Sequence, residues 1–110
     1  MDGWHGTLQQ AMDQLTDPEG KRSATVFMHG TLKVLLYAPL GSDPQIPHDR
    51  DEIYVIAKGS GRFKLGERSF DINEGDVIFV PARTEHRFEN FTEDLAAWVL
   101  FYGPKGGEEQ

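Results

Sequence analysis

The chain has 110 residues, no cysteine and a formal net charge of −7, with 11 Lys and Arg against 18 Asp and Glu. This length supports one domain with one core, the lack of cysteine excludes disulfides and thiolate metal sites, and the acidic balance argues against nucleic-acid binding. The N-terminus lacks a basic region followed by an apolar stretch, and the longest apolar run, 95–102, is too short to span a membrane, so we expect a cytoplasmic protein without membrane contact.

The N-terminal segment carries a helical pattern. Apolar residues recur there at helical spacing: Trp4, Leu8, Met12 and Leu15. Thr7 and Gln10 have the spacing of a capping box, in which each side chain satisfies a backbone N–H at the start of a helix. The sequence therefore predicts one short amphipathic helix over residues 7–15, within an N-terminal helix and arm that occupy residues 1–22.

Short strands are predicted over the rest of the chain. Segments rich in β-branched and aromatic residues, most of them separated by glycine-bearing turns, predict eight strands: 24–28, 31–38, 52–57, 62–65, 68–72, 77–80, 86–90 and 96–102. Eight short strands in one domain favour an all-β fold, a closed or two-sheet antiparallel barrel, because an open sheet of that length would leave its edges exposed. We expect residues 23–103 to form the barrel and residues 104–110 to form a flexible tail.

The predicted strands differ in how their two faces alternate. Residues 62–65 and 86–90 alternate charged side chains with inward-facing ones, which indicates one wet face and one buried face. Residues 53–56 and 97–101 are apolar on both faces, so the N-terminal helix, an N-terminal strand or a second subunit should cover the outside of that sheet. We expect a homodimer that packs Ile53 and Val55, or the face of Ala97, Val99 and Phe101, against its partner.

Candidate metal ligands lie on two of these strands. His48, Glu52 and Tyr54 have the same parity, so their side chains can point into one barrel interior, and His86 can point into the same space from another strand. Two neutral imidazoles and one carboxylate suit Fe(II), Mn(II), Zn(II) or Ni(II) and leave positions open for water or substrate. The sequence therefore predicts one divalent transition metal per chain, bound by His48, Glu52 and His86.

The spacing of these residues is similar to that of a known family. Seven positions define two ordered motifs: His48, Glu52 and Gly59, then Gly75, Pro81, His86 and Asn90. Over residues 41–102 the chain resembles a small single-domain cupin, and both motifs of that family are represented. The resemblance implies a double-stranded β-helix, that is a jelly-roll barrel, with a short N-terminal helix.

Two positions depart from the cupin motifs. Arg83 stands where the family has a glycine, and it is interpreted either as an exposed replacement or as a bidentate contact to a substrate carboxylate. Ile46 stands where the family has its first histidine, and a side chain that ends in methyl groups cannot bind a metal. The resemblance then implies a site with three protein ligands, unless the loop 43–47 bulges and Gln45 supplies a fourth through its amide oxygen.

The predicted function follows from this site and stays general, because one barrel fold hosts many chemistries. The leading hypothesis is a divalent-metal-binding cupin that holds or converts a small organic molecule in the barrel mouth, with Tyr54 as an acid or an orienting group. A non-catalytic small-ligand or metal-sensing module is one alternative, and an Fe(II)-type dioxygenase or metal-assisted isomerase is another. A metal-free barrel retained for assembly is the third alternative.

Overall fold

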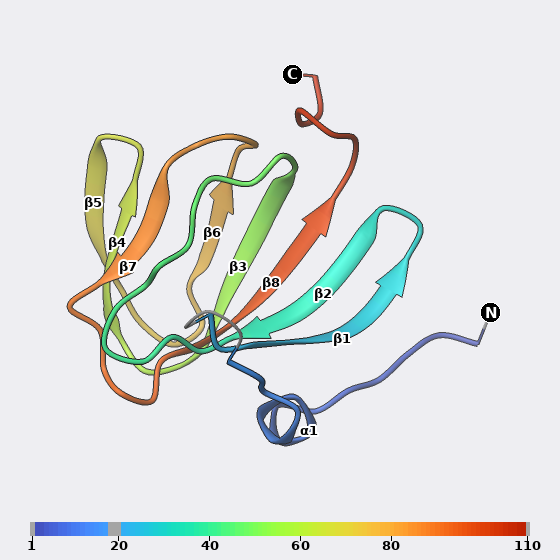
Figure 1. The fold of residues 1–110 in the computed structure, drawn as a ribbon, viewed down its shortest axis with the longest axis horizontal. Coiled ribbons are helices and arrows are strands. Elements are labelled where there is room, and N and C mark those ends of the chain that lie inside the picture. The colour runs from blue at the N-terminus through green and yellow to red at the C-terminus, as the bar shows by residue number, and fades with distance from the viewer. Residues whose placement is uncertain (1, 18–20, 110) are drawn as a thin grey trace.

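A computed structural model of the chain describes residues 2–17 and 21–109, and in this part it contains one helix and eight strands (Figure 1). The elements are α1 (Leu8–Asp13), β1 (Ser23–His29), β2 (Leu32–Tyr37), β3 (Asp51–Lys58), β4 (Gly61–Leu65), β5 (Arg68–Ile72), β6 (Val77–Val80), β7 (His86–Glu89) and β8 (Ala96–Tyr102). All eight predicted strands are present, with ends that differ from the prediction by one residue at most. Residues 18–20 of the predicted N-terminal arm lie outside the described residues, and no described helix is long and apolar enough to cross a bilayer.

The capping box predicted at the start of the helix is present. The Thr7 hydroxyl accepts a hydrogen bond from the Gln10 backbone N–H, and the Gln10 side chain accepts one from the Thr7 N–H. Thr7 is therefore the N-cap and lies outside the helix, while Gln14 is the C-cap. This is why the helix is shorter than the predicted range 7–15.

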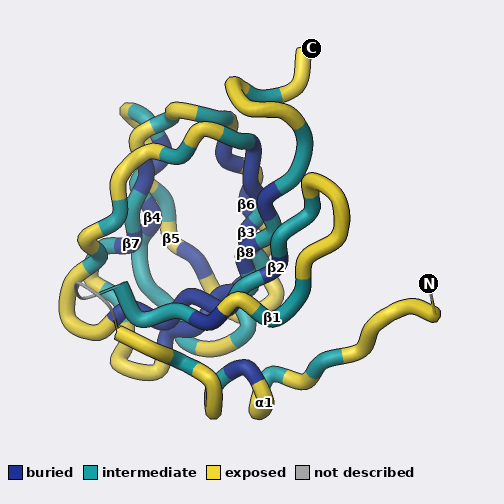
Figure 2. The backbone as a smooth tube through the Cα atoms, turned by 45° about the vertical axis from the view of Figure 1, so that its right-hand side comes forward, coloured by how far each residue is buried: buried dark blue, intermediate teal, exposed yellow. Residues whose placement is uncertain are grey.

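The strands form two antiparallel sheets. Five strands pair in the order β1-β2-β8-β3-β6, and three pair in the order β5-β4-β7. Figure 2 shows the two sheets as opposite walls, with buried segments of the tube on both sides of the space between them. The main core contains side chains from both sheets, among them Tyr54 and Val99 from the larger sheet and Phe63 and Phe88 from the smaller one. The expected all-β, two-sheet architecture is confirmed.

The alternating strands bury the faces that the sequence predicts. Phe63 and Phe88 are buried opposite each other on β4 and β7, while Arg87 and Glu89 flank Phe88 on the outer face. Asn90 is exposed and has a φ of 47°, so it belongs to the turn that ends β7 and not to the inner face. A positive φ suits Asn better than most residues because its short polar side chain tolerates the left-handed region.

The outer face of the five-stranded sheet is covered over part of its area. Helix α1 packs Ala11 against Leu36, Ala38 and Ala96, which form a second, smaller core cluster (Figure 1). Beyond the helix, outward residues of β3 and β6 pair as Ile53 with Phe79 and Val55 with Val77. Val77 is 67% exposed and Phe79 is 46% exposed. An apolar strip therefore remains on this face.

The expectation that Ala97, Val99 and Phe101 pack against a second subunit is wrong. All three residues belong to the main core inside the barrel, whereas Trp98 and Leu100 alternate with them on the outer side. Because β8 is apolar on both faces, its sequence does not indicate which face is inside. The pairing of β8 between β2 and β3 decides this.

The segment after β8 returns to the barrel. The carboxylate of Asp51, which is buried, accepts hydrogen bonds of 2.9 Å from the backbone N–H groups of Ala82 and Glu108. The N–H of Gly106 donates to the carbonyl of Asp49. Residues 104–110 were expected to form a flexible tail; residue 110 lies outside the described residues, and Gly106 and Glu108 tie the described part to the start of β3.

Candidate metal centre

Three candidate ligands meet inside the barrel. Glu52 lies on β3, His86 is the first residue of β7, and His48 lies in the loop that leads to β3. Glu52 is 1% exposed and His86 is 2% exposed, while His48 is partly exposed. One nitrogen or carboxylate oxygen from each residue lies within 4.8 Å of the others. The structure therefore brings together the three residues that the sequence predicts as ligands.

The carboxylate of Glu52 lies between the two imidazoles. Its Oε1 is 2.8 Å from Nε2 of His86, and its Oε2 is 3.2 Å from Nδ1 of His48. Both oxygens and Nδ1 of His48 are buried, yet none of them makes a hydrogen bond of acceptable geometry with a described residue. Leaving buried polar atoms unsatisfied costs free energy. A divalent cation coordinated by these atoms would satisfy all three, so the residues present fit a metal.

The orientation of the His86 ring is fixed by a contact of the ring nitrogen that faces away from Glu52. Its Nδ1 lies 2.8 Å from the carbonyl oxygen of Thr84. A carbonyl can only accept, so Nδ1 carries the proton, and in the neutral ring Nε2 keeps its lone pair. Nε2 is the atom that faces Glu52. This arrangement, in which the far ring nitrogen donates to a backbone carbonyl, is the usual support of a metal-binding histidine.

The ionisation of His86 and Glu52 is coupled. Burial by itself lowers the pKa of His86, but its close contact with the Glu52 carboxylate and its hydrogen bond with the Thr84 carbonyl outweigh burial and raise that pKa above its usual range. Burial raises the pKa of Glu52, but its interactions with His48 and His86 outweigh burial and lower that pKa. Without a metal, the centre therefore favours an ionised Glu52 beside a protonated His86, and a metal must compete with that proton.

Tyr54 lies directly beside the three candidate ligands. Its hydroxyl is 3.1 Å from Nε2 of His86 and donates a 3.0 Å hydrogen bond to the amide oxygen of Gln45. Burial, followed by the negative charge of Glu52, raises the pKa of Tyr54 well above its usual range. The phenol therefore stays protonated and acts as a hydrogen-bond donor at this position.

The loop 43–47 turns inward and is held by Asp43. The Asp43 carboxylate accepts hydrogen bonds from the Gln45 side chain at 2.7 Å, from the Phe88 N–H at 2.8 Å and from the Tyr37 hydroxyl. The amide oxygen of Gln45 thus faces the centre but is engaged by Tyr54, and its role as a fourth ligand stays a prediction. Sequence reasoning missed the role of Asp43, because its contact with β7 joins residues 45 positions apart in the chain.

The two positions that depart from the cupin motifs both lie at the surface. Ile46 is 64% exposed. Arg83 has a φ of 64°, in the left-handed region that favours glycine, which gives a physical reason for a glycine at this position. The Arg83 side chain is 64% exposed and its Nε lies 3.4 Å from Asp49. The backbone N–H of Arg83 donates to the carbonyl of His48, while its side chain pairs with Asp49, and a contact of that side chain with a substrate stays a prediction.

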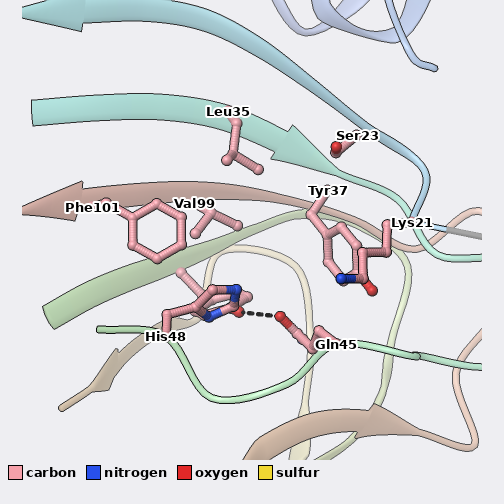
Figure 3. Close-up of a pocket in the computed structure, with 9 residues that line it drawn as sticks. Lys21, Ser23, Leu35, Tyr37, Gln45, His48, Val99 and Phe101 are labelled. Atoms are coloured by element: carbon pink, nitrogen blue, oxygen red, sulfur yellow. Dashed lines mark hydrogen bonds between the residues drawn. The ribbon is translucent and has the colours of Figure 1, made fainter. Parts of the chain in front are cut away.

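A pocket of about 110 Å³ opens beside the ligands (Figure 3). Its wall is apolar on the sheet side and polar elsewhere, and the lining residues are Lys21, Ser23, Leu35, Tyr37, Gln45, His48, Tyr54, Val99 and Phe101. In Figure 3, Gln45 and His48 extend from the loop before β3 toward Leu35, Val99 and Phe101 on β2 and β8. Because His48 and Tyr54 line it, a small molecule in this pocket lies next to the candidate centre.

Comparison with known proteins identifies the family. The family model described as the cupin domain matches residues 33–102. This chain belongs to the cupin family. The matched region contains β2 from its second residue, all strands from β3 to β8 and every candidate site residue, so the resemblance drawn from the motif spacing is confirmed.

Relatives of this cupin occur in distant organisms. It is 34% identical over 64 residues to uncharacterized protein SCO3923 of Streptomyces coelicolor, across 58% of this chain and 61% of that protein. It is 35% identical over 54 residues to uncharacterized protein MJ1618 of Methanocaldococcus jannaschii, across 47% of this chain and 43% of that protein. The cupin thus spans less than two thirds of either relative.

Solved structures share the fold. KdgF from Halomonas sp. matches with a TM-score of 0.71 at 19% identity, across 83% of this cupin and 88% of that chain. A Cupin 2 conserved barrel domain protein from Salinispora arenicola matches with a TM-score of 0.71 at 15% identity, across 94% of this cupin and 91% of that chain. At these identities the likeness concerns the fold alone, and it confirms the expected cupin architecture.

Proposed function

We propose that this cupin binds one divalent transition metal per chain through His48, Glu52 and His86, and that it holds or converts a small organic molecule in the barrel mouth. The observation that carries this proposal is the Glu52 carboxylate, whose two buried oxygens lie between imidazole nitrogens without a hydrogen bond of acceptable geometry. A cation coordinated by these oxygens and by the imidazole nitrogens would satisfy the group and would replace the proton that His86 shares with it in the metal-free chain.

The donor set narrows the choice of metal. Two imidazoles and one carboxylate suit Fe(II), Mn(II), Zn(II) and Ni(II). When bound, such an ion supplies Lewis-acid chemistry and leaves coordination positions for water or a substrate. Gln45 is the candidate for a fourth protein ligand, because its amide oxygen faces Tyr54 at the edge of the centre.

Tyr54 is assigned a positioning role. Its raised pKa keeps the hydroxyl protonated, and its hydrogen bond to Gln45 directs that proton away from His86. In the metal-free chain, a hydroxyl lone pair can then face Nε2 of His86 when that nitrogen carries a proton, at the observed 3.1 Å. This supports an orienting role for Tyr54 over a role as a general acid.

Metal content tests the proposal directly. The purified chain should contain about one metal per chain after incubation with each of the four ions in turn and removal of the excess. His86→Ala should abolish this content, because it removes a ligand and leaves Glu52 without its closest partner. His29→Ala is the matched control, since His29 is exposed at the end of β1. Equal metal content in His86→Ala and the parent chain would overturn the ligand assignment.

Oxygen uptake separates conversion from holding. A centre with three protein ligands keeps open positions, which is the arrangement that non-haem Fe(II) oxygenases use. The Fe(II)-loaded chain should therefore be assayed for oxygen consumption with diketones, thiols and aromatic diols. Consumption that the His86→Ala variant lacks would support a dioxygenase, and its absence across the panel would favour a binding module.

A further inference from the structure

A second pocket adjoins the candidate centre. It has a volume of about 280 Å³, shares Leu35, His48 and Phe101 with the barrel pocket, and is completed by Lys33, Asp49 and Arg50. Because His48 lines both pockets, a molecule in the second one lies at the edge of the proposed metal centre. The proposed function does not account for the two basic residues in its wall.

Lys33 extends from the inner face of the barrel sheet. It pairs with Phe101 across β2 and β8, just as Leu35 pairs with Val99. Directly paired residues project from the same face of a sheet, and Val99 and Phe101 belong to the interior core. The sheet therefore presents a lysine on a face that is otherwise apolar or aromatic at this position.

Arg50 is held beside Lys33 by two contacts. Its guanidinium carbon lies 5.8 Å from the centre of the Phe101 ring, and one of its N–H groups donates to the carbonyl of Thr31. A guanidinium has five N–H groups, so most of its donors stay free for a ligand. The cation–π contact keeps the planar group against one wall of the pocket.

Asp49 does not neutralise these two cations. Its carboxylate is paired with Nε of Arg83 at 3.4 Å and with Nζ of Lys105 at 3.7 Å. Among the ion pairs of residues 2–17 and 21–109, Lys33 and Arg50 have no carboxylate partner. The chain has a net charge of −7, so two cations without a carboxylate partner make this pocket locally positive on a negatively charged protein.

We propose that Lys33 and Arg50 bind the anionic group of the small molecule that this cupin takes, a carboxylate or a phosphate. An ammonium beside a guanidinium fork is the combination that recognises such oxyanions. Leu35 and Phe101 provide an apolar wall for the carbon part of the molecule, and the shared residue His48 places its other end near the metal. The substrate is therefore a small organic acid, and its contact with a metal rests on the proposed function above.

The first experiment uses the full chain without metal, so that its outcome does not depend on metal binding. Succinate, its neutral diamide succinamide and inorganic phosphate are titrated at constant ionic strength, and dissociation constants are taken from backbone amide chemical shifts. We expect succinate or phosphate to bind at least tenfold more tightly than succinamide. The tighter of the two anions indicates whether the natural acid is a carboxylate or a phosphate. If neither succinate nor phosphate binds more tightly than succinamide, the proposal is overturned.

Matched variants locate the binding. The double substitution Lys33→Met with Arg50→Gln should weaken binding of the tighter anion at least tenfold. Arg62→Gln with Lys64→Met removes the same charge from two basic residues on β4 that pair with Asp71 and Glu85, and it should change affinity less than twofold. Equal losses of affinity in both double variants would show that net charge causes the effect, and would overturn the assignment of the anion to this pocket.

One further variant covers the case in which loss of Arg50 disturbs the fold. Lys33→Met alone leaves the contacts of Arg50 with Thr31 and Phe101 in place and should weaken binding of the anion at least threefold. Unchanged affinity in this folded variant would overturn the proposal. Metal content, measured on the same variants, should equal that of the parent chain, since neither residue is a proposed ligand. If the parent chain binds no metal, the proposed metal site is wrong, but the result of the anion titration is unaffected.

Discussion

The substitution Glu52→Gln tests the centre most directly, because it keeps the size of the side chain and removes the charge that lies between His48 and His86. A cation that binds only the folded chain stabilises it by about 2.7 kcal/mol when its concentration is 100 times the dissociation constant. For a domain of this size, that gain raises the melting temperature by about 10 °C.

Loss of the carboxylate should weaken metal binding at least 100-fold, since even an outer-shell partner is worth about 10- to 100-fold. At the same metal concentration, the stabilisation of Glu52→Gln then falls to about 0.4 kcal/mol, or about 2 °C in melting temperature. Thermal melting with and without metal measures both values.

The matched control is Glu85→Gln, which removes the same charge from an exposed residue paired with Lys64. It should keep the full metal-dependent rise in melting temperature. The reasoning is refuted if Glu52→Gln keeps that rise as well, because the orphaned carboxylate would then not be a ligand. It is also refuted if none of the four metals raises the melting temperature of the parent chain.

Three further predictions concern pH, assembly and backbone strain. Because the pKa of His86 is raised in the folded chain, protonation of His86 stabilises the metal-free fold: this stabilisation is complete below the usual histidine pKa and is lost as pH rises through the raised pKa. Urea unfolding of the metal-free chain over this pH range should show the loss. A His86→Ala variant with the same pH dependence would contradict this prediction. We predict a homodimer in which each chain packs its apolar strip, Ile53, Val55, Val77 and Phe79, against the partner. Val77→Asp should therefore halve the mass measured by light scattering. A parent chain that is monomeric at micromolar concentration would rule out the dimer. Arg83→Val should cost about 1–2 kcal/mol in urea unfolding, because a β-branched residue is disfavoured at positive φ, whereas Arg83→Gly should be tolerated; equal stability of the two variants would contradict this reason.

Much of the fold could be predicted from local pattern. The strand positions follow from β-branched and aromatic runs between turns, and the capping box of Thr7 and Gln10 marks where the helix begins. The buried faces of β4 and β7 follow from alternation, because every second side chain on a strand points the same way. Parity also indicated that His48, Glu52 and Tyr54 can share one face with His86 opposite them, and the cupin motifs contain His48, Glu52 and His86.

The sequence by itself therefore determined the position of each helix and strand. Where polar and apolar residues alternate, it also determined which face of the strand is buried. Only the tertiary structure decided which face of β8 is inside, because a strand that is apolar on both sides carries no alternation to read. It also decided that Asp43 accepts a hydrogen bond from the Phe88 N–H on β7, and that Lys33 and Arg50 share a pocket beside His48. These relations join residues far apart in the chain, and long-range strand pairing and packing, which no local pattern encodes, bring them together.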